Sequence, residues 1–190
     1  MKKFLAVLLV ALVALTSVFA ADSTITLKNT VAGTEPSVQV KYGSAEKSLS
    51  LISTKDDNVE GKLNELGGKR YFAVELSGNW AADKNFDITF EPSAFELYDS
   101  NFTNKLTPNN GSYTVPTTFE MTGTNYVDGE KTLATSSFDA ASNTLSVGYK
   151  AYSNISTSKV VAKGTLTWNP VTDLVAGNYK ATVKITVSDK

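Results

Sequence analysis

The sequence contains no histidine and no cysteine, and these two absences exclude much of the chemistry that enzymes use. The chain cannot form a Ser-His-Asp or Cys-His catalytic site, nor a zinc site with the usual histidine or cysteine ligands. It also lacks the side chain best suited to proton transfer near neutral pH. An enzyme made from this chain would depend on carboxylates, lysine or tyrosine. We therefore expect a protein without enzymatic activity, metal or cofactor.

A strong excess of charge of either sign is absent as well. The formal net charge is −1, and removal of Lys2 and Lys3 with an N-terminal leader takes it to −3. Arg70 is the only arginine, although arginine is the residue best suited to phosphate recognition. A charge this small does not steer a protein toward nucleic acid. No nucleic-acid partner is expected.

Residues 1–20 have the three parts of a cleavable secretory signal peptide. Lys2 and Lys3 form the basic region, residues 4–15 are an unbroken apolar run, and Val18 and Ala20 mark a cleavage site. The apolar run is shorter than the roughly 20 residues that cross a bilayer. We expect cleavage after Ala20. The mature protein would then be periplasmic, at the cell surface or secreted, and would not span a membrane.

Residues 21–190 are sufficient for one domain that folds without disulfides. A chain of about 150 residues buries roughly 70% of the surface that its unfolded form exposes. Small secreted domains usually rely on disulfide bridges, but this chain has no cysteine to form one. We expect residues 21–190 to be a single domain whose stability comes from its hydrophobic core.

Alternation of apolar and polar residues is the dominant pattern of this region, and it predicts an all-β fold. The segments with this pattern are 25–27, 38–42, 49–51, 71–77, 86–91, 95–98, 113–121, 144–152, 160–168 and 179–187. Turn-forming residues separate them, as at Asp128 and Gly129. About nine or ten short strands at this spacing indicate an antiparallel β-sandwich or barrel.

One short helix near residues 57–66 is an alternative to a connecting loop. Val59, Leu63 and Leu66 have the i, i+4, i+7 spacing of a helix face, and Gly67 would end the helix. Gly61 lies within this segment and weakens the helix prediction.

Two groups of acidic residues resemble catalytic or metal sites without completing one. Asp83, Asn85 and Asp87 have the spacing of the start of a calcium loop, but Ile88 and Ala94 occupy the positions that need glycine and glutamate. A glycosidase would need two facing carboxylates. The candidates for that role all lie in predicted strands, at positions that point outward: Glu75, Glu91, Glu96 and Glu120.

Aromatic residues suggest a second kind of function, carbohydrate binding through exposed ring faces. The candidates are Trp80, at the end of a predicted strand, together with Tyr98 and Tyr126. Tyr152 and Trp168 belong to the same set of aromatics. Packing in the core or at its rim is the alternative role for both tryptophans.

The clearest alternation lies at the C-terminal end of the sequence. Tyr179, Ala181, Val183, Ile185 and Val187 fall on one face of a predicted strand, with polar residues between them. One face of this strand is therefore expected to pack and the other to be wet.

This ending resembles the last strand of bacterial pilin subunits that a chaperone and an usher export and assemble. In that family a glycine lies fourteen residues from the C-terminus and precedes an alternating strand, and Gly177 is the fourteenth residue from the end here. The resemblance implies an Ig-like sandwich whose last strand is recognised by strand addition. The alternative is that residues 179–187 pair within the chain's own complete sandwich.

These patterns favour a non-enzymatic exported envelope protein, structural or adhesive, that acts through contacts with another protein or with itself. A carbohydrate-binding β-sandwich module is the alternative function.

Overall fold

Residues 32–52 and 63–190, which the computed structural model describes, form β-strands and connecting segments without a helix. The strands are β1 (Thr34–Gly43), β2 (Ser50–Leu51), β3 (Gly68–Trp80), β4 (Lys84–Pro92), β5 (Phe95–Tyr98), β6 (Thr114–Val115), β7 (Thr117–Gly123), β8 (Tyr126–Asp128), β9 (Lys131–Asp139), β10 (Thr144–Tyr149), β11 (Ser153–Trp168), β12 (Asn178–Lys180) and β13 (Val183–Asp189). The all-β prediction is confirmed.

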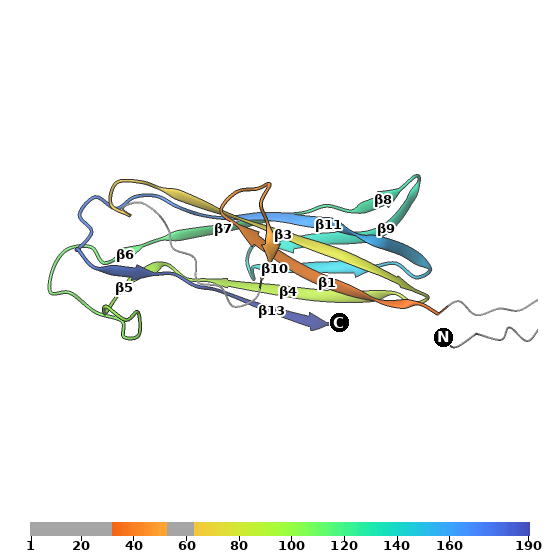
Figure 1. The fold of residues 1–190 in the computed structure, drawn as a ribbon, viewed down its shortest axis with the longest axis horizontal. Helices are drawn as coiled ribbons and strands as arrows, with labels where there is room; N and C mark the ends of the chain where they lie inside the picture. The colour runs from red at the N-terminus through yellow and green to blue at the C-terminus, as the bar shows by residue number, and fades with distance from the viewer. Residues whose placement is uncertain (1–31, 53–62) are drawn as a thin grey trace, which may run out of the picture. The chain divides into compact units, whose positions relative to one another are not determined.

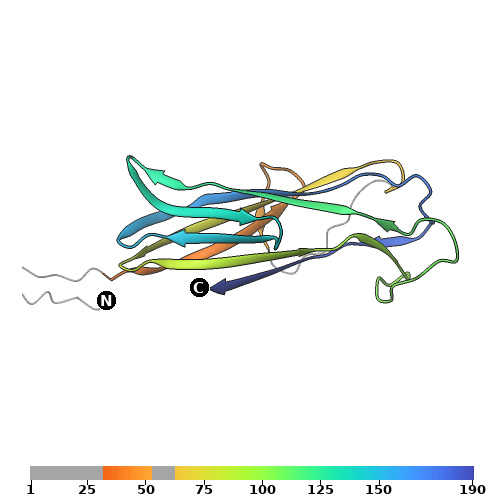
Figure 2. The same cartoon turned by 180° about the vertical axis from the view of Figure 1, so that it is seen from behind.

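The strands form three antiparallel sheets (Figures 1 and 2). The first sheet has the order β2-β1-β3-β11-β7, and the second has the order β13-β4-β10-β9-β8. The third and smallest sheet has the order β12-β5-β6. Strands distant in sequence are neighbours in each large sheet, as in the pairing of Lys163 with Ala73 between β11 and β3.

The main core lies between the first and second sheets and is built from the alternating residues that face it. Its fully buried members include Leu76 and Val74 of β3, Ile88 of β4, and Leu145 and Tyr149 of β10. Each large apolar side chain contributes about 1.5–3 kcal/mol when it is removed from water. The alternation of these strands therefore accounts for how the two sheets hold together.

A second, smaller core lies beside the third sheet. Phe95, Val115 and Trp168 are its buried members, and the rings of Phe95 and Trp168 meet edge to face at 5.1 Å. Trp168 therefore has the core-packing role that was one of its two predicted alternatives. Pro116 separates β6 from β7, which splits the single predicted strand 113–121 into two because proline cannot donate to a strand ladder.

The helix predicted near residues 57–66 is not supported. Residues 57–62 lie outside the described part of the chain, and Leu63, Asn64 and Glu65 form a turn. Leu63 packs against the second core while Leu66 is exposed, so the spacing that suggested a helix face does not bury both leucines on one surface. The signal peptide and residues 25–27 also lie outside the described part.

Candidate strand-addition edge

The predicted C-terminal strand 179–187 is interrupted in the structure, and this prediction is wrong in its continuity. β12 pairs with β5 in the third sheet, whereas β13 pairs with β4 in the second. The paired strands are interrupted at the same place, because β4 ends at Pro92 and β5 begins at Phe95. Ser93 bridges the two interruptions: its N–H donates to the carbonyl of Thr182, and its Oγ accepts from the amide of Thr182, both at 2.8 Å.

This interruption divides the predicted apolar face between two cores. Tyr179 and Ala181 pack against the second core, and Val183 and Ile185 pack against the main core. Val187 is 47% exposed, so the packed face ends before the strand does. Gly177 precedes β12 and approaches Leu97 so closely that a Cβ atom there would lie 2.4 Å from Leu97 Cδ1.

Within β13, backbone groups alternate between β4 and the outer side of the strand. The N–H of Lys190 donates to Asn85 O at 3.0 Å, and Thr182 O accepts from Ser93 N. The even-numbered residues of this segment therefore direct their backbone groups toward β4. Because successive residues of a strand point these groups to opposite sides, the N–H and C=O groups of Ile185 and Val187 point away from β4. No strand of residues 32–52 or 63–190 pairs with that outer side.

Ion pairs connect the C-terminal end of β13 to the start of β4. Lys84 Nζ lies 2.7 Å from an oxygen of Asp189 and 3.4 Å from one of Glu35 at the start of β1. Asp189, and after it Glu35, hold the pKa of Lys84 above its usual value. Lys190 Nζ lies 3.1 Å from Asp87. These pairs bring the ends of β1, β4 and β13 together.

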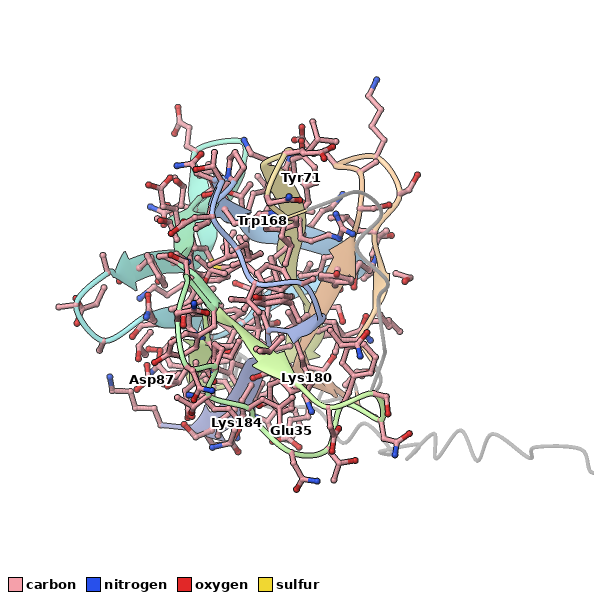
Figure 3. All side chains as sticks on the ribbon, turned by 90° about the vertical axis from the view of Figure 1, so that its left-hand side faces the viewer. Glu35, Tyr71, Asp87, Trp168, Lys180 and Lys184 are labelled. Carbon is pink, nitrogen blue, oxygen red and sulfur yellow. The ribbon has the colours of Figure 1, made fainter. Side chains whose placement is uncertain are left out.

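Asp87 accepts a hydrogen bond from the Ser146 hydroxyl at 2.6 Å. This bond, together with the Lys190 ammonium, holds the pKa of the Asp87 carboxyl below its usual value. In Figure 3, Asp87 and Lys184 of the second sheet lie apart from Tyr71 and Trp168 of the first. Of the calcium-loop residues, Asp87 thus bonds to Ser146 and Lys190, and Asp83 accepts from the N–H of Ala151 at 2.7 Å.

Three of the four predicted outward carboxylates are paired with lysines, and the fourth, Glu120, lines a groove described below. Glu75 lies 2.8 Å from Lys41, and Glu91 lies 3.2 Å from Lys184. Glu96 pairs with Lys105 at 2.5 Å. Such pairing on sheet surfaces supplies no facing pair of carboxylates of the kind that glycoside hydrolysis uses. In the described part of the chain, no group of three or more acidic side chains is positioned to hold a metal ion.

Two of the aromatic residues proposed for sugar stacking, Trp80 and Tyr98, lie far apart. Trp80 ends β3 and Tyr98 ends β5, and these two strand ends lie at opposite ends of the ribbon (Figure 1). Lys180 Nζ lies 4.8 Å from the centre of the Tyr98 ring, and Lys159 Nζ lies 5.7 Å from the centre of the Tyr126 ring. A cation thus occupies a face of each tyrosine. Trp80 is 40% exposed.

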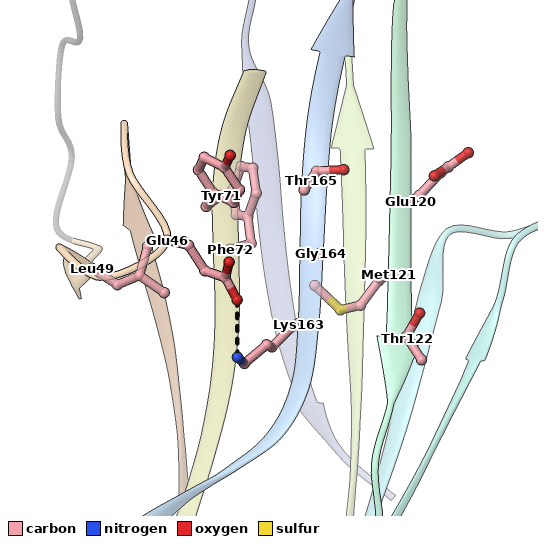
Figure 4. A pocket seen from close by; sticks show the side chains of 10 residues that line it. All are labelled: Glu46, Leu49, Tyr71, Phe72, Glu120, Met121, Thr122, Lys163, Gly164 and Thr165. Atoms are coloured by element: carbon pink, nitrogen blue, oxygen red, sulfur yellow. Dashed lines mark hydrogen bonds and ion pairs between the residues drawn. The ribbon is translucent and has the colours of Figure 1, made fainter.

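A groove that the sequence did not predict lies over β3, β7 and β11 (Figure 4). Its volume is about 230 Å³, and the ion pair between Lys163 and Glu46, at 3.1 Å, crosses it. Tyr71, Glu120 and Thr165 also line it. Because these residues come from three strands that are neighbours only in the folded sheet, no local sequence pattern could reveal the groove.

Comparison of the chain with protein-family models, with curated protein sequences and with solved structures found no match. Among the described residues, no helix has the length and hydropathy that crossing a membrane requires.

Proposed function

We propose that this chain is an exported, non-enzymatic envelope protein, structural or adhesive in the manner of a fimbrial subunit, which acts through protein contacts at the outer side of β13. In this proposal the two facing sheets are an Ig-like sandwich, and the protein works in the periplasm, at the cell surface or after secretion. The observation that carries the proposal is that Ile185 and Val187 direct their N–H and C=O groups away from β4, where no described strand meets them.

The composition of β13 supports this proposal, because proteins commonly block exposed sheet edges. Short edge strands, bulges, prolines and inward-pointing charges all prevent another chain from pairing. β2 has two residues, β8 has three and a register shift, and β7 begins directly after Pro116. β13 has seven residues, pairs with β4 without a register shift, and carries valine and isoleucine at the positions that face the interior.

Strand addition needs backbone groups for affinity and side-chain contacts for specificity. The outer side of β13 provides the first. The half-buried side chains of Val183 and Ile185, with the exposed side chain of Val187, provide the second. An added strand would cover the apolar area that these three side chains leave in water, at about 25 cal/mol per Å².

The test is light scattering on size-separated protein that has been exported from cells expressing the full chain. We expect wild-type protein to form species larger than a monomer. Val187→Pro removes an N–H that points outward, and should reduce these species while the ladder to β4 is kept. Val187→Thr keeps that N–H and exchanges one methyl group for a hydroxyl, so it is the matched control and should lose far less assembly than Val187→Pro.

A wild-type protein that stays monomeric across the concentrations tested would refute self-assembly through β13. Equal assembly by wild type and Val187→Pro would place the contact elsewhere on the chain. Circular dichroism of each variant verifies that the sheets have formed before the comparison is made.

A further inference from the structure

The end of β3 and the connection between β10 and β11 form one exposed corner of the structure. Ser153 pairs in register with Trp80, and both segments lie at the same end of the ribbon in Figures 1 and 2. The N–H of Tyr152 donates to Trp80 O at 3.0 Å. Asp83 Oδ1 accepts from the N–H of Ala151 at 2.7 Å. We call Trp80, Asp83, Lys150 and Tyr152 the aromatic corner.

The buried side chain of Tyr149 holds the backbone of the aromatic corner in place through hydrogen bonds. The Tyr149 hydroxyl accepts from the N–H of Trp80 at 3.1 Å, and its one proton is donated to the carbonyl of Ser153 or of Gly78. Trp80 is also supported from the side, because a Cβ atom at Gly33 would lie 3.1 Å from its ring carbon Cε3. Preorganised groups of this kind lose little freedom on binding a ligand.

Tyr152 has an unfavourable backbone conformation, and its side chain is not buried in the fold. Its side chain is 86% exposed, and its φ of +57° lies in the left-handed region, which a bulky residue rarely adopts. Asparagine or glycine would adopt this backbone more easily. Burial does not explain the tyrosine, because its ring lies in water. Its position beside Trp80, added to this unfavourable backbone, points to a role outside folding.

The chemistry of the aromatic corner fits an uncharged sugar. Trp80 and Tyr152 provide two exposed aromatic side chains on adjacent segments, and rings of this type supply apolar faces with a polar edge. Asp83 is exposed, and its Oδ2 has no hydrogen-bond partner among the described residues, so it is available to accept from a hydroxyl. Lys150, also exposed, can donate to one. The Asp83 carboxylate disfavours an anionic lipid surface or a sulfated chain.

We propose that the aromatic corner is a carbohydrate-binding site for neutral saccharides, in which Tyr152 and Trp80 contact the sugar ring and Asp83 and Lys150 bind its hydroxyls. The site differs from the set that the sequence suggested. Tyr98 lies at the opposite end of the ribbon (Figure 1), and a lysine lies over the ring of both Tyr98 and Tyr126, so Tyr152 takes their place. It does not depend on strand addition at β13.

The test is binding of labelled protein, exported from cells expressing the full chain, to an array of immobilised neutral, sialylated and sulfated oligosaccharides. Wild type should bind neutral members. Tyr152→Asn removes the ring but suits the left-handed backbone, and should weaken binding at least about tenfold, equivalent to about 1.4 kcal/mol. Phe102→Asn is the matched control. Phe102 is also exposed, at 44%, with a φ of +54°, but it lies in the loop after β5.

Loss of binding in Tyr152→Asn, with binding kept in Phe102→Asn, supports the proposal. Weaker saccharide binding by Trp80→Ala would support it further, provided that circular dichroism shows this variant to be folded. The proposal is overturned by a wild type that binds no neutral saccharide, by binding confined to sulfated members, or by equal binding in Tyr152→Asn and wild type. The proposal would also be overturned if wild-type protein sedimented with phosphatidylcholine vesicles and did not bind saccharides.

Discussion

Replacement of Tyr149 by phenylalanine is the sharpest test of how the end of the main core is held. The substitution removes one oxygen and keeps the ring, which is fully buried, so it leaves no large cavity. The lost hydroxyl accepts from Trp80 N at 3.1 Å and donates to one of two carbonyls, those of Gly78 and Ser153. Each such bond contributes about 0.5–1.5 kcal/mol, and a buried group left without a partner costs about 1–3 kcal/mol.

We expect Tyr149→Phe to lower the free energy of unfolding by about 2–3 kcal/mol. For a domain of this size, that corresponds to a fall in Tm of roughly 5–10 °C. Urea denaturation followed by far-ultraviolet circular dichroism measures the change, and the m-value should stay the same because the surface exposed on unfolding is unchanged.

Tyr179→Phe is the matched control for this experiment. The Tyr179 hydroxyl donates a single bond, to Val175 O at 2.6 Å, from a part-buried position. Its loss should cost about 1 kcal/mol. If Tyr149→Phe costs no more than Tyr179→Phe, the Tyr149 hydroxyl does not join the ends of β3, β10 and β11 as argued above.

Two further predictions concern charge and packing. The pKa of Asp87 is lowered in the folded state, chiefly by the Ser146 hydroxyl, so its contribution to stability is complete above its ordinary pKa of 3.8 and is lost as the pH falls through the folded value. Asp87→Asn should therefore be less stable than wild type at pH 7, and urea midpoints measured from pH 7 to pH 2 should converge at the acid end; a constant gap would contradict the linkage. Leu76→Ala, at a fully buried position of β3, should cost about 2–5 kcal/mol in urea denaturation. Leu106→Ala, at a leucine that is 42% exposed, should cost far less, and similar losses would show that the main core is misplaced.

Strands with apolar residues at alternate positions were predictable from the sequence, and those with small or polar inward residues were not. Segments 38–42, 71–77 and 86–91 carry large apolar side chains and lie within strands. The predicted strand 144–152 is too long, because β10 ends at Tyr149 and residues 150–152 connect it to β11. β9 was missed because its buried inward residue is Ala134, followed by Ser136, whose hydroxyl donates to Val161 O at 2.5 Å. No hydrophobic alternation marks such a strand. The thirteen strands of the described residues exceed the nine or ten expected, partly because several have only two or three residues.

Register shifts limited the prediction of β11 and of the C-terminal strand. β11 begins at Ser153, but only 160–168 was predicted, because shifts between Ile155 and Lys159 and between Val160 and Ala162 interrupt its alternation. The interruption between β12 and β13 could not be predicted from local alternation either, because it depends on the bonds between Thr182 and Ser93, which lies 89 residues away in the sequence. Alternation along 179–187 therefore predicted which residues pack, but not that they pack in two cores.

The sequence alone predicts more of the proposed site on β13 than of the aromatic corner. The apolar side chains of β13 are visible in its alternation, although the direction of its backbone groups follows only from its pairing with β4. Tyr152 lies at a strand end in sequence, and nothing there shows a left-handed backbone or its contact with Trp80. Both facts arise from the connection between the two large sheets.

The two proposed sites can be tested separately, although the aromatic corner lies close to the end of β13. Lys84 follows Asp83 of the aromatic corner and pairs with Asp189 at the end of β13. A change at one site could therefore reach the other through this ion pair. Val187→Pro lies outside the pair, as does Tyr152→Asn, so each variant should alter only its own function: assembly for the first, saccharide binding for the second. If both functions fell together in either variant, the start of β4 would have to be a shared element of one site, and Lys84→Gln would then reduce both.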